Sequence, residues 1–88
     1  MRIEFKDNAK EDLRGFDAQL KLFFKQHIDK LASMPLRKKH LKFGIPFHKE
    51  DVTKQARLID DLSEDVFYVV RCFATHKEYE KWYKSYKS

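Results

Sequence analysis

The sequence predicts an α+β fold in which a helical hairpin packs on a small, mostly antiparallel sheet. Three observations carry this prediction. The length of 88 residues suits one domain. The first half has apolar residues at helical spacing, and the second half has runs of β-branched and aromatic residues. The expected order of elements is β-α-α-β-β-β-α, in one domain over residues 1–88.

The N-terminal residues predict a strand followed by a short helix. Residues 2–6 alternate charged and apolar side chains, which is typical of a half-buried strand. The side-chain oxygens of Asp7 and Asn8 are suited to cap a helix, which we expect over residues 9–14. Gly15 then ends this helix, because glycine is a weak helix former.

A second helix follows, with Asp17 as its candidate N-cap. An apolar stripe with spacings of four, four and three residues predicts it, formed by Leu20, Phe24, Ile28 and Leu31. We expect the two helices to form a hairpin that covers one face of the sheet. The other face is expected to be an open, concave surface with positive charge at its rim.

The second half of the chain predicts three strands and a closing helix. The strands are expected over residues 40–43, 55–61 and 66–73, with the last at the centre because it is richest in β-branched and aromatic residues. Residues 47–53 are expected to form a loop, and residues 63–65 a hairpin turn. A helix that starts at position 76 is predicted by an aromatic stripe, formed by Tyr79, Trp82, Tyr83 and Tyr86.

Composition argues against membrane and disulfide-bonded classes of protein. Charged residues make up 38% of the chain, and its longest uncharged apolar run, residues 66–70, is far shorter than the roughly 20 residues of a membrane-spanning helix. The first residues lack the apolar core of a signal peptide, so we expect a cytoplasmic protein. Cys72 is the only cysteine, which excludes an internal disulfide. It is interpreted as a small buried hydrophobe, with a nucleophilic role as the alternative.

Positive charge is concentrated in one segment of the chain. Residues 36–57 contain seven Lys and Arg and two acidic residues, so this segment carries the whole net charge of +5. A basic block on an otherwise balanced chain favours a polyanion-binding surface, and a solvated basic loop is the alternative. The candidate RNA-binding residues are Lys39, Lys42, His48, Lys49 and Lys54.

No cofactor or metal site is expected from the sequence. The four histidines lie in four different predicted elements, and no pair of His or Cys has ligand spacing within one element. With two glycines in the whole chain, there is no glycine-rich phosphate-binding loop.

Several side chains in the second half suit metal-free RNA cleavage. This reaction needs a base for the 2′-OH proton, cations to stabilise the phosphorane, and an acid for the departing 5′-oxygen. Histidine serves as base or acid near neutral pH, and arginine holds phosphate oxygens with two donors. The candidates are His48, Lys49, Lys54, Arg57, Arg71, His76 and Tyr79. The structural alternatives are an ion pair between Arg57 and Asp61, and a position of Arg71 at the sheet rim.

Two segments of the chain resemble those of a known toxin family. In residues 70–79, a strand containing Arg71 leads to Thr75-His76 and then Tyr79, which resembles the C-terminal signature of HigB-type toxins. Residues 55–59 resemble the Arg-Leu-Val strand of RelE and its relatives. The predicted element order and the length also match the RelE/ParE superfamily.

The resemblance implies a toxin of a type II toxin–antitoxin system that cuts mRNA in the ribosomal A site without a metal. Arg57 would stabilise the transition state, and Arg71 would be a second phosphate-binding arginine. His76 would transfer a proton, and Tyr79 would orient or stack on a base. Glu50 is an alternative base. This chain has a histidine where RelE has a late tyrosine, which places it nearer the histidine-using members.

The implied partners are mRNA, the 70S ribosome and a cognate antitoxin. We expect an acidic, partly disordered antitoxin segment to cover Arg57 and Arg71. Two other functions remain open from the sequence. One is a ParE-like toxin that inhibits DNA gyrase without nuclease activity, and the other is an RNA- or ribosome-binding domain without catalysis.

Overall fold

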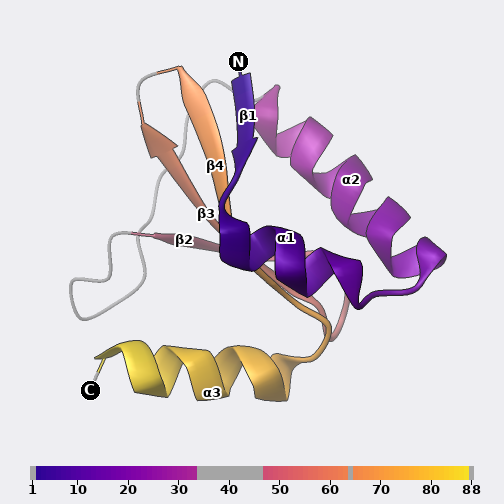
Figure 1. Cartoon of the computed structure of the whole chain (residues 1–88), viewed down its shortest axis with the longest axis vertical. Coiled ribbons are helices and arrows are strands. Elements are labelled where there is room, and N and C mark those ends of the chain that lie inside the picture. The colour runs from indigo at the N-terminus through magenta and orange to yellow at the C-terminus, as the bar shows by residue number, and fades with distance from the viewer. Residues whose placement is uncertain (1, 34–46, 64, 88) are drawn as a thin grey trace.

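The predicted order of elements is confirmed. The computed structural model describes residues 2–33, 47–63 and 65–87 (Figure 1). Its elements are β1 (Arg2–Phe5), α1 (Asp7–Arg14), α2 (Ala18–Ala32), β2 (His48–Asp51), β3 (Arg57–Ser63), β4 (Val66–Phe73) and α3 (His76–Lys87). None of the helices in this described part is long and apolar enough to cross a membrane. The predicted strand over 40–43 lies outside the described residues.

The four strands form one sheet in the order β1-β4-β3-β2, so β4 has the predicted central position. Strands β2, β3 and β4 pair antiparallel in sequence order, whereas β1 lies parallel to β4. The sheet is therefore mostly antiparallel, as expected. The β3–β4 register shifts between Ile59 and Asp60, and this irregularity gives Val70 no directly opposed residue.

One element prediction was wrong, because residues 48–51 form strand β2 rather than part of a loop. The segment His48-Lys49-Glu50-Asp51 is polar and charged, so its own β propensity is low. Its strand conformation is set by pairing with residues 57–60 of β3. The last strand of a sheet tolerates charged side chains, so tertiary pairing overrides local preference here.

The helix starts show one correct and one wrong prediction. Asp17 caps α2, because its carboxylate accepts a hydrogen bond from the amide of Leu20 at 2.8 Å. Neither Asp7 nor Asn8 is the cap of α1, since the helix begins at Asp7 and Lys6 holds the capping position without a side-chain hydrogen bond. Asp7 lies in the first turn, where its negative charge interacts favourably with the helix dipole and stabilises the helix.

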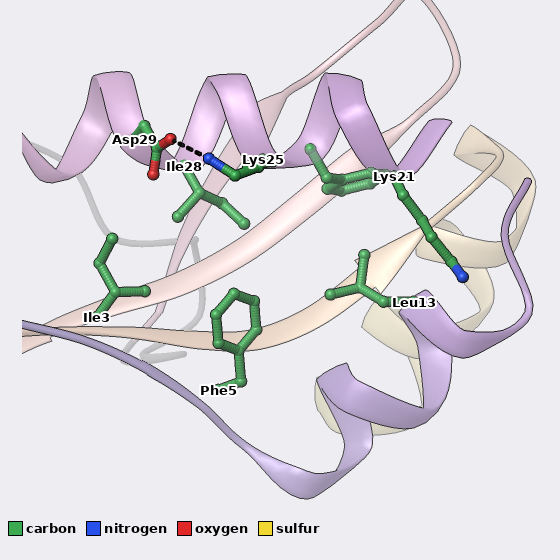
Figure 2. A pocket seen from close by; sticks show the side chains of 8 residues that line it. Ile3, Phe5, Leu13, Lys21, Lys25, Ile28 and Asp29 are labelled. Atoms are coloured by element: carbon green, nitrogen blue, oxygen red, sulfur yellow. Dashed lines mark hydrogen bonds and ion pairs between the residues drawn. The ribbon is translucent and has the colours of Figure 1, made fainter. Parts of the chain in front are cut away.

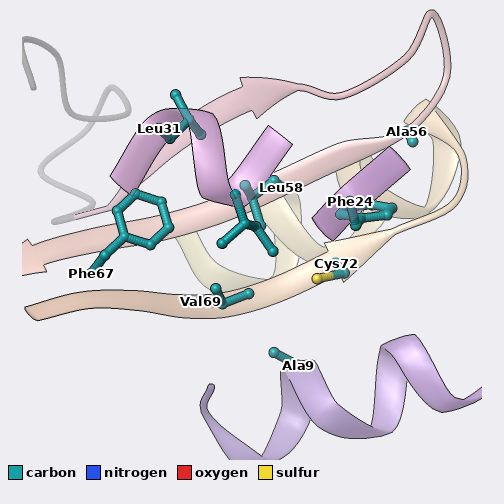
Figure 3. Packing of buried hydrophobic residues seen from close by; sticks show 9 residues of the cluster. Ala9, Phe24, Leu31, Ala56, Leu58, Phe67, Val69 and Cys72 are labelled. Atoms are coloured by element: carbon teal, nitrogen blue, oxygen red, sulfur yellow. The ribbon is translucent and has the colours of Figure 1, made fainter. Parts of the chain in front are cut away.

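The main core lies between the helical hairpin and one face of the sheet (Figure 3). The predicted stripe of α2 supplies Phe24, Ile28 and Leu31, all at most 7% exposed. These side chains pack against residues of β3 and β4 that share this face, which are Leu58, Phe67, Val69 and Cys72. Helix α1 adds Ala9, whose small side chain lets the helix lie close to the sheet.

The opposite face of the sheet is not the open surface that the sequence predicts. A second cluster contains Ile59, Phe73 and Tyr79, all at most 8% exposed, with Trp82 and Tyr83 of α3 packed against it. The aromatic stripe of α3 is thus a packing stripe, because these rings are removed from water only by lying on the strands. The rest of this face lies beside α3 and carries the polar residues described next.

Cys72 is buried, at 1% exposure, and burial raises the pKa of its thiol. This supports its interpretation as a small core residue, since the thiolate is the reactive form. We expect labelling by a soluble thiol reagent at pH 8 to be at least about 100-fold slower in the folded protein than in the unfolded chain. Comparing labelling rates in buffer and in denaturing urea measures this. Equal rates would show that the strand end around Cys72 opens readily.

Candidate functional site

The structure brings together four of the residues that the sequence singled out. We call Lys49, Arg57, His76 and Tyr79 the cationic cluster. The first two lie on paired strands β2 and β3, and the last two lie on the first turn of α3. The Nζ atom of Lys49 is 5.8 Å from the ring centre of Tyr79, and the rings of His76 and Tyr79 are 5.8 Å apart.

Arg57 is held firmly in place by the short loop before it. Its Nη1 donates hydrogen bonds to the carbonyl oxygens of Thr53, Lys54 and Ala56, at 3.1, 3.2 and 3.0 Å. Its Nε also lies 3.1 Å from a carboxylate oxygen of Asp51. The ion-pair partner is therefore Asp51, directly opposite Arg57 across the β2–β3 pair, rather than Asp61. This guanidinium is fixed in one direction before any ligand arrives.

The side chain of Thr75 caps the start of α3 and so fixes the position of His76. The hydroxyl of Thr75 accepts a hydrogen bond from the amide of Glu78 and donates one to its carboxylate, both at 3.2 Å. The Thr-x-x-Glu spacing is a signal in the sequence for the start of a helix. The amide of His76 also donates to the side-chain oxygen of Gln55 at 3.4 Å. The loop that holds Arg57 thus also holds His76.

The two nitrogens of the His76 imidazole have different surroundings. Nε2 lies 3.4 Å from a carboxylate oxygen of Glu80, one helical turn further on. Nδ1 is buried and has no hydrogen-bond partner among the described residues. A buried ring nitrogen without a partner is uncommon, because the missing hydrogen bond costs free energy. Because Nδ1 is shielded from solvent whereas the side chain as a whole is 43% exposed, a ligand reaches this imidazole on the Nε2 side, where it competes with Glu80.

Tyr79 is 8% exposed, and its phenol is in the neutral form near pH 7. Burial raises the pKa of this phenol, the nearby Tyr83 acts in the same direction, and the positive charge of Arg57 opposes the rise. A neutral phenol donates a hydrogen bond, and its ring offers a flat apolar surface. Tyr79 can thus hold a phosphate oxygen or contact a base, but it carries no negative charge that would repel RNA.

Arg71 does not belong to the cationic cluster. Its Nε and Nη2 donate hydrogen bonds to both carboxylate oxygens of Asp12 in α1, at 2.7 and 3.0 Å. One of these oxygens also accepts the amide of Cys72 at 2.9 Å. Strand β1 pairs with β4 only as far as Val69. Beyond Val69, the carboxylate of Asp12 rather than a neighbouring strand binds the backbone edge of β4. The hydrogen bonds with Asp12 also raise the pKa of Arg71.

The remaining predicted RNA-binding residues have different positions. Lys54 is exposed, and its ammonium group has no ion pair within the described ranges. His48 is 6% exposed, and its Nδ1 lies 3.8 Å from the fully buried carboxylate of Asp60. Because neighbouring strand residues alternate, His48 is directed to the face of β2 opposite Lys49, so we leave it out of the candidate site. Lys39 and Lys42 lie outside the described residues.

Two acidic residues near the cationic cluster, Asp51 and Glu80, were not predicted from the sequence. Asp51 pairs with both Arg57 and Lys49, the latter at 3.3 Å, and Glu80 pairs with His76. The i,i+4 spacing of His76 and Glu80 was a visible signal, whereas Asp51 required the strand register. Glu50, the alternative base, is directed to the opposite face of β2, because neighbouring strand residues alternate. The described residues contain no group of three His, Cys, Asp or Glu able to hold a metal ion.

Comparison with solved structures identifies the fold. A chain of the intact RelBE toxin–antitoxin complex from E. coli matches with a TM-score of 0.69 and 15% identity, over 81% of this chain and 92% of that one. A metal-bound toxin from Helicobacter pylori matches with a TM-score of 0.68 and 25% identity, over 89% and 97%. A chain of the RelB–RelE antitoxin–toxin complex from Methanococcus jannaschii matches with a TM-score of 0.66 and 13% identity, over 90% and 96%.

Sequence comparison adds no closer relative, since no protein-family model and no curated protein matches the chain. The DinJ–YafQ complex from E. coli is a further structural match, with a TM-score of 0.59 and 17% identity, over 89% of this chain and 97% of that one. The chain therefore has the RelE-type toxin fold, as its sequence predicts.

Proposed function

We propose that this chain, which has the fold of RelE-type toxins, is the toxin of a type II toxin–antitoxin pair and cuts mRNA in the ribosomal A site. The observation that carries the proposal is the cationic cluster. It joins two cations, a neutral phenol and a partly exposed imidazole on one side of the molecule. These are the group types that metal-free RNA cleavage requires.

In the proposed reaction, the 2′-oxygen of one nucleotide attacks the adjacent phosphorus and the bond to the 5′-oxygen breaks. The products are a 2′,3′-cyclic phosphate and a 5′-OH. His76 exchanges a proton with one of these oxygens through Nε2, which leaves Glu80 to do so, and solvent water exchanges a proton with the other oxygen. Arg57 and Lys49 stabilise the negative charge that grows on the phosphorane. Tyr79 donates a hydrogen bond from its neutral hydroxyl.

Asp51 has a specific place in this proposal. Its carboxylate lies 3.1 Å from Arg57 Nε and 3.3 Å from Lys49 Nζ, and its side chain is 59% exposed. An exposed carboxylate between two cations occupies a position that suits a phosphate oxygen. We infer that the scissile phosphate replaces Asp51 as the partner of these cations. The backbone hydrogen bonds of Arg57 need not change in that exchange.

The proposed partner in the resting cell is an antitoxin with an acidic segment. Structural neighbours of this chain include toxin–antitoxin complexes, which supports a partner of this kind. An acidic segment that folds over the cationic cluster would neutralise Lys49 and Arg57 and block RNA. Arg71, which the sequence also predicted to be covered, is already bound by Asp12 and adds little to such an interface.

Mapping mRNA 5′ ends after brief expression of the chain tests the proposed function. We expect new ends within translated reading frames, at fixed positions relative to codons, and none in the presence of an inhibitor that occupies the ribosomal A site. Growth arrest without new 5′ ends would contradict the nuclease proposal. In that case, accumulation of cleaved DNA bound to gyrase would support the ParE-like alternative.

A further inference from the structure

A cavity of about 730 Å³ lies on the sheet face that carries α3. Sites for small ligands commonly hold about 300–1,000 Å³. Its walls come from separate parts of the chain, which are residues 6–8 at the start of α1, strands β3 and β4, and the second half of α3 (Figure 1). The cationic cluster contributes none of the lining residues, since its α3 residues lie on the first turn of that helix.

One wall of this cavity is aromatic. Phe47, Trp82 and Tyr86 line it, and the centres of their rings lie 5.4–6.5 Å apart. Tyr86 is 47% exposed, so part of this ring surface is in contact with water. Exposed aromatic rings bind other flat rings by stacking. The wall therefore suits a planar heteroaromatic ligand.

The irregularity in the β3–β4 register shapes the adjoining wall. Neighbouring residues of a regular strand are directed to opposite faces, yet Val70 and Arg71 both line this cavity. The register shift that leaves Val70 without an opposed residue accounts for this, because such irregularities redirect side chains. The guanidinium of Arg71 stays bound to Asp12, so it forms a fixed part of the wall.

Two charged side chains of this cavity, Asp61 and Lys6, have no ion pair with any residue that the structure describes. Both lie near Tyr68, because Asp61 is directly opposed to it across the strand pair and Lys6 Nζ is 4.5 Å from the centre of its ring. An ionised carboxylate only accepts hydrogen bonds, whereas an ammonium group only donates them. The matching ligand thus has N–H donors for Asp61 and an anionic group for Lys6.

We propose that this cavity binds a guanine base of a single-stranded RNA. The ring stacks on the aromatic wall, its N1–H and 2-amino groups donate to the two oxygens of Asp61, and a phosphate of the same strand meets Lys6. Guanine alone among the four RNA bases has two adjacent N–H donors on its Watson–Crick edge, the edge that proteins read in unstacked bases. Adenine and cytosine have an acceptor beside the amino group, and uracil has one N–H between two carbonyls. The RNA source of the base rests on the proposed function, whereas the selection of guanine rests on Asp61 and the aromatic wall.

Charged ligands fit this cavity less well than a neutral ring. Lys6 and Arg71 repel a cationic group such as the side chain of an arginine in a protein partner. Asp7 and Asp61 repel an acidic peptide in the same way. A neutral base avoids both effects and leaves its phosphate outside, at the position of Lys6.

The apolar cavity between β1 and the helical hairpin lacks the group that would select guanine. It holds about 380 Å³, and Figure 2 shows Ile3, Phe5 and Leu13 directed into it. The carboxylate that lines it, that of Asp29, is bound to Lys25 at 3.0 Å. A base in that cavity would be held by apolar contact alone, so a preference for guanine points to the cavity beside Asp61.

Trp82 is the only tryptophan of the chain, so its fluorescence reports on this cavity without a label. We expect guanosine 5′-monophosphate (GMP) to quench this fluorescence when the whole chain is titrated. GMP should bind at least about tenfold more tightly than inosine 5′-monophosphate, which lacks only the 2-amino group, because a hydrogen bond to a charged group is lost. Both ligands meet the wild-type chain, so the comparison does not depend on how well a variant folds.

Asp61→Asn leaves one acceptor in place of two and should reduce the preference for GMP over the inosine nucleotide to less than about threefold. The matched control is Asp65→Asn, the same substitution at an exposed carboxylate next to the β3–β4 turn, which does not line the cavity. This control should keep the wild-type preference.

A 2′-O-methyl pentanucleotide of four uridines around one guanosine tests the RNA source, because it has no 2′-OH and cannot be cut. We expect it to bind at least about tenfold more tightly than GMP, since it reaches a second set of contacts at the cationic cluster. Lys49→Ala should remove most of this gain and leave the binding of GMP unchanged. A pentanucleotide that binds no better than GMP would assign the cavity to a free guanine nucleotide and overturn the RNA source.

Three results would overturn the selection of guanine. They are the absence of quenching at about 1 mM GMP, where a weak specific site is half filled, equal binding of the two nucleotides, and displacement of GMP by an arginine tripeptide at a similar concentration. A preference that survives in Asp61→Asn would remove Asp61 from the site. None of these measurements involves RNA cleavage, so their failure is distinguishable from failure of the proposed nuclease function.

Discussion

His76→Ala should lower the rate of mRNA cleavage by about 10²–10⁴-fold, the usual contribution of a general acid or base. The imidazole side chain is 43% exposed and packs on Tyr79 without being part of the core, so its removal should leave the fold intact. The measurement is single-turnover cleavage of mRNA on programmed ribosomes, with wild type and variant at equal concentration. Growth arrest on expression should be lost in parallel.

The matched control for this variant is Lys77→Ala, at the next position of the same helix. Lys77 is exposed and has no ion pair within the described part of the chain. We expect its cleavage rate to stay within about threefold of wild type, the scale of a weak exposed charge. Equal loss in both variants would mean that positive charge near the start of α3, rather than proton transfer at position 76, determines activity. A wild-type rate in His76→Ala would remove His76 from the site.

Arg57 requires a different variant, because it also has a structural role. Its hydrogen bonds to three carbonyl oxygens hold the loop over residues 52–56, so Arg57→Ala would disturb that loop and Gln55, which binds the backbone of His76. Asp51→Asn is more informative, since it removes the carboxylate that competes with the phosphate and leaves Arg57 in place. If the proposed exchange occurs, this variant binds RNA more tightly than wild type.

Most of the fold was predictable from the sequence because its elements follow local patterns. The apolar stripe of α2, the β-branched run of β4 and the aromatic stripe of α3 can each be recognised within a short stretch of sequence. Strand β2 was missed because its four residues are polar and become a strand only by pairing with β3. The covering of the second sheet face by α3 was also missed, because periodicity shows that a stripe is buried but not which surface buries it.

The candidate site was predictable in its residue types but not in its pairing. The resemblance to RelE and to HigB-type toxins pointed to Arg57, Arg71, His76 and Tyr79 as one group. Three of these lie together, whereas Arg71 is bound by Asp12, a residue 59 positions earlier in the chain. Contacts over such a separation leave no signal in local spacing. The same holds for Asp51, which meets Arg57 through the register of two strands.

Asp12→Ala is expected to lower the free energy of unfolding by about 2–3 kcal/mol. Breaking a buried ion pair costs about 3–5 kcal/mol, which we reduce because the side chains of Asp12 and Arg71 are 16% and 27% exposed. The change leaves both donors of Arg71 and the amide of Cys72 without their acceptor. Urea unfolding measures the loss, and the corresponding fall in Tm is about 10–20 °C for a domain of this size.

The matched control is Asp29→Ala, the same substitution at an exposed carboxylate. Asp29 pairs with Lys25 one turn away on α2, and the two side chains are 55% and 72% exposed. Such pairs contribute about 0.3–0.5 kcal/mol, so this variant should unfold at almost the same urea concentration as wild type. A similar loss in both variants would indicate that Asp12 matters only through its charge, and not as the acceptor at the edge of β4.

Combining Asp12→Ala with Arg71→Ala separates the structural role of Arg71 from a role in RNA cleavage. If Arg71 serves mainly to hold α1 on β4, the double variant should be less destabilised than the sum of the two single variants, since each removes the same contact. Cleavage measured on the folded fraction should then change little in Arg71→Ala. A loss of more than about 10²-fold in the folded fraction would instead mean that Arg71 leaves Asp12 to bind a phosphate. In that case Asp12 would hold Arg71 only until RNA binds, as Asp51 does for Arg57.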